Sequence, residues 1–275
     1  MTEAADIREP ETPASSEAKG CSLQQLVLRR PYYEDAHCTI YHGDCRQILD
    51  SVPTIDLVLT DPPYGMAYNS GWTNASNAIR SDGVRQGVRL LRAALFEMQT
   101  RLAPDAHFYT FCHWESWPDF YDTASTYFNL RNALIWWKDR GGMGDLRHEF
   151  GKDYEVILFG ARGRRELTGS RDGCVIEGIA PCPPNKRNHP TEKPDALMRY
   201  IIEKSCPVGG LVCDPFMGAG ATLVAAKSIG RRAVGIELEE KYCEIAARRC
   251  AQEMAMTQAE NDQAQARRAS GVDCK

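Results

Sequence analysis

The sequence of 275 residues has no long apolar run, and this excludes one broad class of protein. No stretch approaches the roughly 18 consecutive apolar residues that a membrane-spanning helix needs. The first twenty residues, MTEAADIREPETPASSEAKG, also lack a basic segment followed by an apolar one, which is the pattern of a secretory leader. We therefore expect a cytoplasmic protein with no membrane partner.

Zinc-type cysteine spacing and a strong net charge are lacking as well. The eleven cysteines include no Cys-x-x-Cys pair and no Cys/His cluster of the zinc type. Most of them lie in apolar runs, so we expect buried thiols and no bound metal. The formal net charge of −4 does not single out a polyanionic partner, although a sum over the whole chain hides local basic patches.

Short apolar, β-branched runs alternate with helical stretches through the middle of the chain. This alternation predicts an α/β fold with a mostly parallel, doubly wound sheet. The polar composition of residues 1–22 and 257–275 predicts disordered tails, which leaves one domain at 23–256. The expected strands are 38–42, 55–60, 107–112, 132–137, 154–160, 210–214 and 232–238. The expected helices are 84–102, 118–127, 195–205, 221–229 and 240–256.

A tetrapeptide, Asp61-Pro62-Pro63-Tyr64, directly follows the expected strand 55–60. In open α/β sheets ligands bind at the carboxyl ends of the strands. Two successive prolines cannot continue a β ladder, so they form a rigid extended exit that aims the acid and the aromatic ring. Taken alone, the tetrapeptide would more simply be a turn that ends a strand.

The stretch GLVCDPFMGAGATLVAAKSIGRRAVGIELEEKY at 210–242 predicts a strand, a glycine turn, a helix, a second strand and an acid, in that order. Gly218 and Gly220 allow a tight turn that comes close to a ligand, and the following helix points its free N–H groups at that ligand. Glu237 lies about 20 residues further on, where a carboxylate can accept two hydrogen bonds from a ribose diol. This order indicates an adenosine-binding site.

The glycine turn lacks the complete Gly-x-Gly-x-x-Gly pattern, because Ala221, Thr222 and Leu223 follow Gly220. A pyrophosphate cradle is therefore disfavoured. A nucleoside with a zwitterionic tail, such as S-adenosylmethionine, fits the pattern better.

Four motifs stand in the order found in one enzyme family, namely DPPY, HPTEKP (189–194), DPFMGAGAT (214–222) and GIELEEKY (235–242). Together they resemble the DNA amino-methyltransferases, which modify adenine N6 or cytosine N4. Because DPPY precedes the glycine block, the chain resembles the β class of that family. The resemblance covers roughly residues 38–250 and implies the Rossmann-like fold of S-adenosylmethionine-dependent methyltransferases.

The resemblance implies a catalytic role for the tetrapeptide. The exocyclic amino nitrogen is a poor nucleophile, since its lone pair is delocalised into the ring. Asp61 and the backbone carbonyl of Pro62, fixed in direction by Pro62 and Pro63, would accept the two amino hydrogens, while Tyr64 would stack on the base. The base must leave the duplex to reach this site, and we expect the loop 65–83 to cover it.

The resemblance also implies a cofactor site. Glu237 would hold the ribose, Asp44 would bind the adenine amino group, and Lys193 could meet the methionine carboxylate. Two local explanations stay open, because Asp44 could cap the next helix and Thr191 could start one. The full expected cofactor-binding set is Asp44, His189, Thr191, Lys193, Asp214, Phe216, Gly218, Gly220, Thr222 and Glu237.

The family carries target recognition between its YEVILFG and HPTEKP motifs. Here that segment, 161–190, contains six basic residues, so we expect it to meet double-stranded DNA. A homodimer and a paired restriction endonuclease are compatible with the resemblance.

The same resemblance implies adenine N6 as the target, with cytosine N4 as the nearest rival, because the cytosine-N4 enzymes tend to carry serine where this chain has Asp61. Cytosine C5 methylation would need a cysteine nucleophile, but Pro181-Cys182 lies in the insertion rather than after a strand that faces the cofactor. The incomplete glycine pattern disfavours a nicotinamide oxidoreductase. Methylation of RNA or of protein glutamine stays open, as does a catalytically silent DNA-binding relative, although intact Asp61, Tyr64 and Glu237 argue against silence.

Overall fold

The computed structural model describes residues 30–63, 84–138, 147–148, 150–183, 185, 187–189 and 192–253. The expected tails, the loop 65–83, and the predicted site residues Tyr64 and Thr191 lie outside the described residues. Among the described ones, no helix combines the length and the apolar character needed to cross a bilayer.

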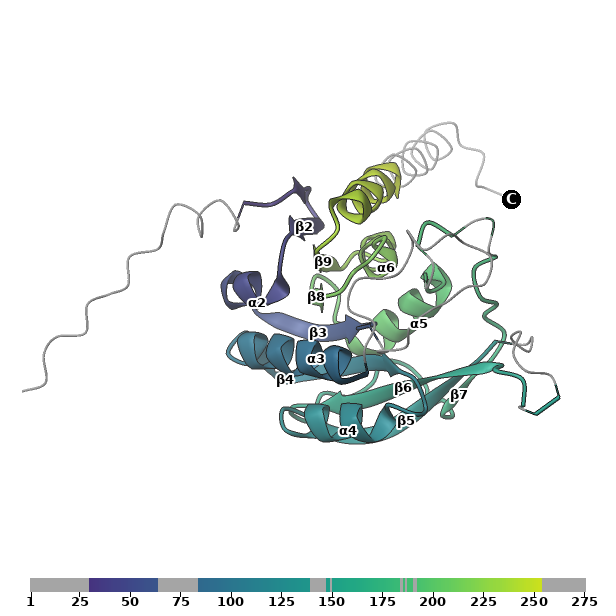
Figure 1. Cartoon of the computed structure of the whole chain (residues 1–275). Coiled ribbons are helices and arrows are strands. Elements are labelled where there is room, and N and C mark those ends of the chain that lie inside the picture. The colour runs from purple at the N-terminus through teal and green to yellow at the C-terminus, as the bar shows by residue number, and fades with distance from the viewer. Residues whose placement is uncertain are drawn as a thin grey trace, which may run out of the picture.

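A nine-stranded sheet forms the centre of the molecule, in the order β1-β2-β9-β8-β3-β4-β6-β5-β7 (Figure 1). The strands are β1 (Tyr33–Glu34), β2 (Cys38–His42), β3 (Ile55–Thr60), β4 (Leu102–Cys112), β5 (Asn129–Trp137), β6 (Tyr154–Ala161), β7 (Val175–Ile176), β8 (Leu211–Asp214) and β9 (Arg232–Glu237). Strands β2, β9, β8, β3 and β4 are parallel, and β6 runs antiparallel to its neighbours β4 and β5. The predicted α/β fold with a mostly parallel sheet is confirmed.

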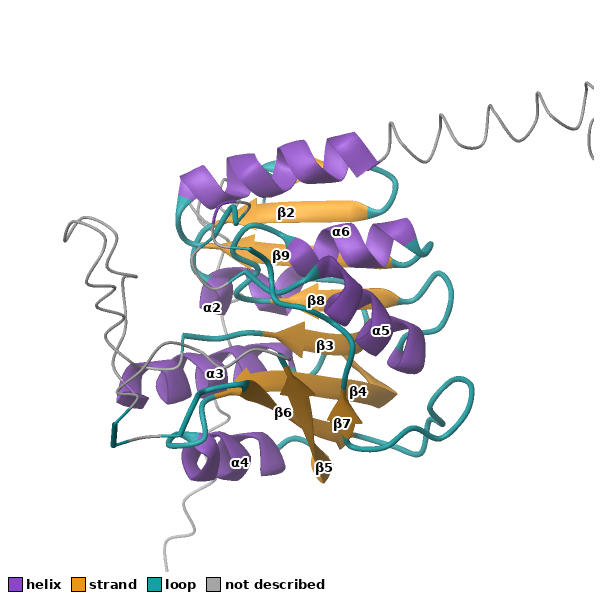
Figure 2. Ribbon diagram, turned by 90° about the vertical axis from the view of Figure 1, so that its right-hand side faces the viewer, coloured by secondary structure: helices purple, strands orange, loops and turns teal. Residues whose placement is uncertain are grey.

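Helices cover both faces of this sheet (Figure 2). They are α2 (Cys45–Ile48), the 3-10 turn η1 (Leu49–Ser51), α3 (Val84–Met98), α4 (Trp117–Ser125), α5 (Asp195–Ser205), α6 (Ala221–Ser228) and the helix 240–253. One apolar core lies between the sheet and α5, α6 and the helix 240–253, and a second lies beneath α2, α3 and α4. The sheet is therefore doubly wound, as the sequence pattern predicts.

The boundary between α3 and β4 differs from the sequence expectation. The helix ends at Met98 rather than at 102, and β4 begins at Leu102 rather than at 107. The pairing of β3 with β4 shifts register after Ile55↔Leu102, so that residue 104, a proline, lies in the irregular part of the ladder. Proline has no N–H to donate to a ladder, so it is tolerated where the ladder is irregular. Its presence makes the early part of the strand hard to predict from the sequence.

The topology creates a switch point between β8 and β3. These two strands are neighbours, yet the chain continues from β8 to β9 on one side and from β3 to β4 on the other. A crevice opens outside the carboxyl ends of strands at such a point. Asp61 directly follows β3 and Asp214 ends β8, so the fold brings two predicted site residues to this crevice.

Candidate active site

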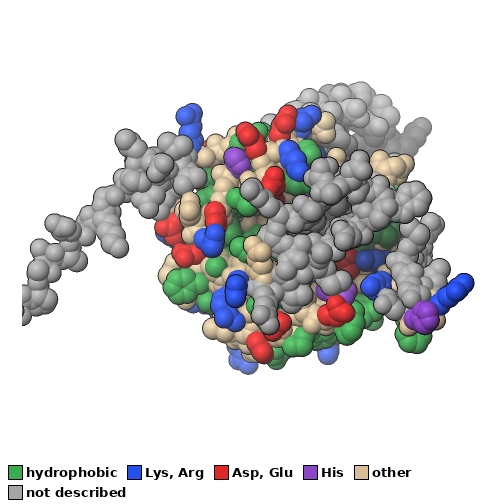
Figure 3. Space-filling view, viewed as in Figure 1, with side chains coloured by type: hydrophobic (Ala, Val, Ile, Leu, Met, Phe, Trp, Pro, Cys, Tyr) green, Lys and Arg blue, Asp and Glu red, His purple; other side chains and the backbone are tan. Residues whose placement is uncertain are grey.

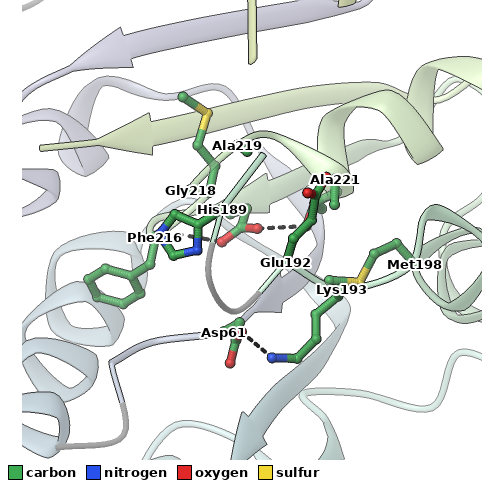
Figure 4. Close-up of a pocket in the computed structure, with 12 residues that line it drawn as sticks. Asp61, His189, Glu192, Lys193, Met198, Phe216, Gly218, Ala219 and Ala221 are labelled. Carbon is green, nitrogen blue, oxygen red and sulfur yellow. Dashed lines mark hydrogen bonds and ion pairs between the residues drawn. The ribbon is translucent and has the colours of Figure 1, made fainter. Parts of the chain in front are cut away.

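A pocket opens at the switch point, with about 370 Å³ of empty space that includes its open mouth. The pocket joins three segments that are distant in the sequence, as Figure 4 shows: the exit of β3, the loop before α5 and the turn between β8 and α6. Its lining includes the predicted site residues Asp61, His189, Lys193, Asp214, Phe216, Gly218 and Thr222.

Asp214 ties the glycine turn to the neighbouring strand. Its Oδ1 accepts hydrogen bonds from Thr60 Oγ1 (2.9 Å) and from the backbone N–H of Phe216 (3.2 Å), and its Oδ2 accepts one from Thr222 Oγ1 (2.6 Å). Burial raises the pKa of Asp214 to about 7, although these hydrogen bonds oppose the rise. Asp214 and Thr222 therefore border the pocket while their polar atoms hold its wall in shape.

The raised pKa of Asp214 predicts a pH dependence of stability. The folded protein keeps a proton on this carboxyl up to about pH 7, whereas the usual pKa of an aspartate is 3.8. The folded state therefore binds more protons than the unfolded state between these values, and the free energy of unfolding falls as pH rises from about 4 to about 7. Asp214→Asn keeps an acceptor oxygen and cannot ionise. Between about pH 5 and pH 8, urea titration should show the wild type losing roughly 2–3 kcal/mol relative to this variant. If the free energy of unfolding fell equally in the wild type and in Asp214→Asn, the raised pKa of Asp214 would be contradicted.

The two glycines of the turn have different tasks. Both have positive φ, +53° at Gly218 and +81° at Gly220. Gly218 faces the pocket, with the ring of His189 about 3.6 Å from where its Cβ would lie. Gly220 is the N-cap of α6, and a Cβ there would lie 2.7 Å from the Cβ of Ala246 in the helix 240–253. Gly218 thus shapes the pocket, whereas Gly220 lets two helices approach.

Replacing Gly220 by alanine should destabilise the fold more than the same change at another left-handed glycine. Gly220→Ala combines left-handed strain with a backbone-level clash, and we expect a loss of about 2–4 kcal/mol in the free energy of unfolding. Gly230, at φ +71° with nothing within 4 Å of its Cβ position, is the matched control, for which strain alone predicts about 1 kcal/mol. If urea unfolding gave similar losses of stability for Gly220→Ala and Gly230→Ala, the contact with Ala246 would be one that relaxes easily.

Glu237 and Asp44 lie at the carboxyl ends of neighbouring strands, β9 and β2. The carboxylate of Glu237 accepts the backbone N–H groups of Gly218 (3.1 Å) and Glu239 (2.9 Å), and burial raises its pKa against the effect of these bonds. Asp44 caps α2, accepts the backbone N–H of Arg46 at 3.0 Å, and pairs with its guanidinium. The capping explanation for Asp44 is therefore confirmed, and its contact with the cofactor stays a prediction, as does that of Glu237 with the ribose.

His189 is an uncharged member of the pocket at neutral pH. Burial and the nearby Lys193 ammonium lower the pKa of His189 to about 4. Its ring packs edge-on against Tyr242, with 4.4 Å between the centroids. His189 can therefore offer a ligand packing area and a neutral imidazole, but no positive charge.

Lys193 extends toward Asp61 rather than along the glycine turn (Figure 4). Its Nζ contacts Asp61 Oδ2 and lies 3.2 Å from Glu155 Oε2. The side chain is only 5% exposed, and these two carboxylates raise its pKa although burial lowers it. The Lys193 charge is thus directed at the expected catalytic carboxylate, which differs from the expected contact with the methionine portion.

Sequence reasoning missed two residues that hold the site together. Glu155, beside Lys193, is a lone acid in the apolar run YEVILFG, and that exception is the signal that could have found it. Arg249, in the helix 240–253, binds Glu192 (2.8 Å), Asp195 (2.8 Å) and the carbonyl of Ala219 (2.7 Å). Nothing in the local sequence distinguishes Arg249 from the other arginines of an amphipathic helix.

The arginines of 161–190 are not all available to DNA. Arg162 donates to the backbone carbonyls of residues 99 and 102, and Arg165 binds the carboxylates of Asp56 (3.0 Å) and Asp105 (2.6 Å). Both arginines follow the carboxyl end of β6, and β6 runs antiparallel to β4. Their contacts therefore lie at the end of the sheet opposite the pocket. Strand β7 runs parallel to β5, so it returns the chain toward the end of the sheet that carries the pocket. Arg162 and Arg165 therefore stabilise the fold, and the contact of the segment 161–190 with DNA stays a prediction that its other basic residues would have to carry.

The described cysteines are mostly buried, as the sequence predicts. On the face in Figure 3, the coloured acidic and basic side chains are interspersed. Seven of the nine cysteines in the described ranges are buried, and all nine are free thiols. In the same ranges, no group of three or more His, Cys, Asp or Glu side chains is arranged to hold a metal ion.

Comparison with known proteins identifies the family. The profile of the DNA methylase family, which covers N6 and N4 enzymes, matches residues 55–248. The chain belongs to this family, and the resemblance stated from the motifs is confirmed.

Individual relatives span most of the chain. The DNA adenine methyltransferase YhdJ of Escherichia coli (strain K12) is 26% identical over an alignment of 246 residues, and the match covers 77% of this chain and 82% of YhdJ. The crystal structure of M1.HpyAVI with S-adenosylmethionine has a TM-score of 0.60 at 23% identity and covers 77% of this chain and 98% of that one. PvuII DNA methyltransferase, a cytosine-N4-specific enzyme, has a TM-score of 0.66 at 16% identity and covers 80% of this chain and 89% of its own. The two structures confirm the methyltransferase fold.

Proposed function

We propose that this DNA methylase transfers the methyl group of S-adenosylmethionine to N6 of adenine in double-stranded DNA, at a specific sequence. The observation that carries the proposal is the shared pocket. Asp61, which would bind the target amino group, and the glycine turn, which would bind the cofactor, line one cavity at the switch point of the sheet. Two substrates held in one cavity react as if in a single molecule, which is the main source of rate in such a transfer.

The residues around Asp61 suit attack by an amino nitrogen. Asp61 and the carbonyl of Pro62 accept the two amino hydrogens, and the nitrogen lone pair is left facing the sulfonium methyl. The new N–C bond forms as the S–C bond breaks, the sulfur leaves neutral as S-adenosylhomocysteine, and one amino proton passes to solvent. No covalent enzyme intermediate is needed, because positioning and electrostatics lower the barrier.

S-adenosylmethionine is the cofactor of this family and is present in the M1.HpyAVI complex. In this chain the turn residues Phe216 and Gly218 would lie against it, with Glu237 at the ribose and Asp44 at the adenine. A positive φ at Gly218 supports the close approach of ligand and backbone. The contribution of Tyr64, as a stacking platform for the flipped base, stays a prediction from the sequence.

The choice of adenine rests on Asp61 and on the similarity to YhdJ, an adenine methyltransferase. Cytosine N4 is the second candidate, because the PvuII enzyme, which shares the fold, is cytosine-N4-specific. Cytosine C5 is disfavoured, since Cys182 is not among the pocket residues and burial raises its pKa, with Glu192 and Asp195 adding to the rise. A raised pKa lowers the fraction of nucleophilic thiolate.

The test is to incubate the protein with unmethylated DNA and S-adenosylmethionine, digest the DNA to nucleosides and analyse them by mass spectrometry. We expect N6-methyladenine. N4-methylcytosine would keep the mechanism and change the base. If no methylated nucleoside forms while the cofactor binds, the substrate is RNA or protein, or the chain is a silent DNA-binding relative.

Target recognition by 161–190, a homodimer and a paired endonuclease stay predictions. Since β7 returns this segment to the pocket edge, its later part is the better placed to meet DNA. Footprinting on DNA would test target recognition by 161–190, and sedimentation analysis would test the homodimer.

A further inference from the structure

Four charged side chains form an alternating chain beside the pocket. Lys193 contacts Asp61 and lies 3.2 Å from Glu155 Oε2, and Lys138 binds the other oxygen of Glu155 at 2.7 Å. The ammonium of Lys193 also lies 4.8 Å from the ring centroid of Phe111 in β4. The order along this chain is therefore acid, base, acid, base, and it begins at the expected catalytic carboxylate.

Burial makes this arrangement costly unless every charge is compensated. Lys193 is 5% exposed and Glu155 22% exposed, whereas most Lys–acid pairs of proteins lie in water. Burial alone would raise the pKa of Glu155, but Lys193 and Lys138 together hold it below its usual value. Both members of the Lys193–Glu155 pair thus stay charged at neutral pH, and breaking a buried pair is far more damaging than breaking an exposed one.

The contact at Oδ2 constrains how Asp61 can rotate. A carboxylate offers about four hydrogen-bonding positions, so one lysine contact is compatible with a substrate amino group on the same side chain. Lys193 is itself held by Glu155 on β6 and follows a loop that Arg249 anchors through Glu192. The orientation of the catalytic carboxylate is therefore set by an element other than its own strand.

We infer that Lys193, held by Glu155, is a positioning residue that orients Asp61 for the target amino group and does not bind the methionine carboxylate of the cofactor. The inference rests on the proposed function. A misplacement of a reacting group by about 1 Å can cost roughly 100-fold in rate. Loss of Lys193 should consequently reduce turnover while leaving cofactor affinity unchanged, which is the opposite of the result for a carboxylate-binding lysine.

The experiment compares Lys193→Met, Lys193→Arg and Glu155→Gln with the wild type, using steady-state kinetics on DNA and calorimetry with S-adenosylmethionine. We expect Lys193→Met to lower kcat by roughly 10- to 100-fold, with the cofactor dissociation constant within about twofold. Lys193→Arg should recover part of the loss, since it restores the charge. Glu155→Gln should lower kcat to a smaller degree, and the double variant Lys193→Met/Glu155→Gln should be no slower than Lys193→Met, because both act through one carboxylate.

Lys204→Met is the matched control, because it breaks a half-buried lysine–aspartate pair (2.7 Å to Asp172) on α5 that is not part of the pocket lining. It should leave kcat within about twofold. A Lys193→Met enzyme with normal kcat, or one whose cofactor binding is weakened by much more than twofold, would overturn the inference. Additive losses in the double variant would do the same.

Failure of the proposed function has a different signature. A wild type that methylates cytosine N4 refutes the choice of adenine but leaves Lys193 to be judged by the same kinetics. A wild type that methylates neither base refutes the proposed function, and the inference falls with it. If Lys193→Met fails to fold, Glu155→Gln and Lys193→Arg still decide through the separation of kcat from cofactor affinity.

Discussion

Asp61→Ala is expected to abolish methyl transfer while S-adenosylmethionine still binds. The substitution removes the carboxylate that would accept an amino hydrogen and stabilise positive charge on the attacking nitrogen. Loss of one such electrostatic group lowers turnover by at least roughly 100-fold. The expected cofactor contacts lie on a different segment of the pocket lining, the turn between β8 and α6, so the dissociation constant measured by calorimetry should change by less than about threefold.

The control for this variant is Asp61→Asn, which keeps an acceptor oxygen but removes the charge. It should retain more activity than Asp61→Ala. Because Asp61 is one of two acids that contact Lys193, the unfolding midpoint of each variant has to be measured too. An alanine variant with normal turnover would refute the role of Asp61. A variant that has lost both turnover and cofactor binding would indicate a collapsed pocket instead.

Glu237→Ala is expected to weaken S-adenosylmethionine binding by about 1.5–3 kcal/mol, which is roughly a 10- to 150-fold rise in the dissociation constant. The removed carboxylate would accept hydrogen bonds from the ribose. It also accepts the backbone N–H of Gly218, so part of the loss comes from a looser glycine turn.

Two further variants separate these contributions. Glu240→Ala removes an exposed acid from the same region and should leave the cofactor affinity unchanged. Glu237→Gln keeps an acceptor for the turn N–H, so an affinity that lies between those of the wild type and Glu237→Ala would divide the effect into ribose and turn parts. An unchanged dissociation constant in Glu237→Ala, measured by calorimetry, would refute the ribose assignment.

Much of the site could be predicted because its parts are local. The apolar run 55–60 predicts a strand, and the prolines after it predict where that strand must end, so Asp61 is assigned to the carboxyl end of β3 without any structure. In the same way, two closely spaced glycines between a strand and a helix predict the turn at Gly218 and Gly220. Their separate tasks, one facing the pocket and the other facing Ala246, depend on which helix packs above them.

The contact of Lys193 with Asp61 could not be predicted from the sequence, because the two residues are distant along the chain. Lys193 and Asp61 are 132 residues apart, and no periodicity or spacing links them. A lysine in a cofactor-side motif suggests a ligand carboxylate, yet the fold brings a protein carboxylate closer. Arg165 is a similar case, since its cluster of neighbouring arginines suggests DNA while the fold offers Asp56 and Asp105.

The sequence by itself determined the alternation of strands and helices and the positions of the acid, the glycines and Glu237 at strand ends, because each of these depends on residues within about twenty positions of one another. It also determined the family, because four motifs between residues 61 and 242 stand in the order of that family. Only the tertiary structure decided which charges meet. It directed Lys193 to Asp61 and Glu155, and committed Arg162 and Arg165 to the far edge of the sheet. The physical reason is that the pairing of buried charges depends on separations in space, which are set by sheet order and helix packing.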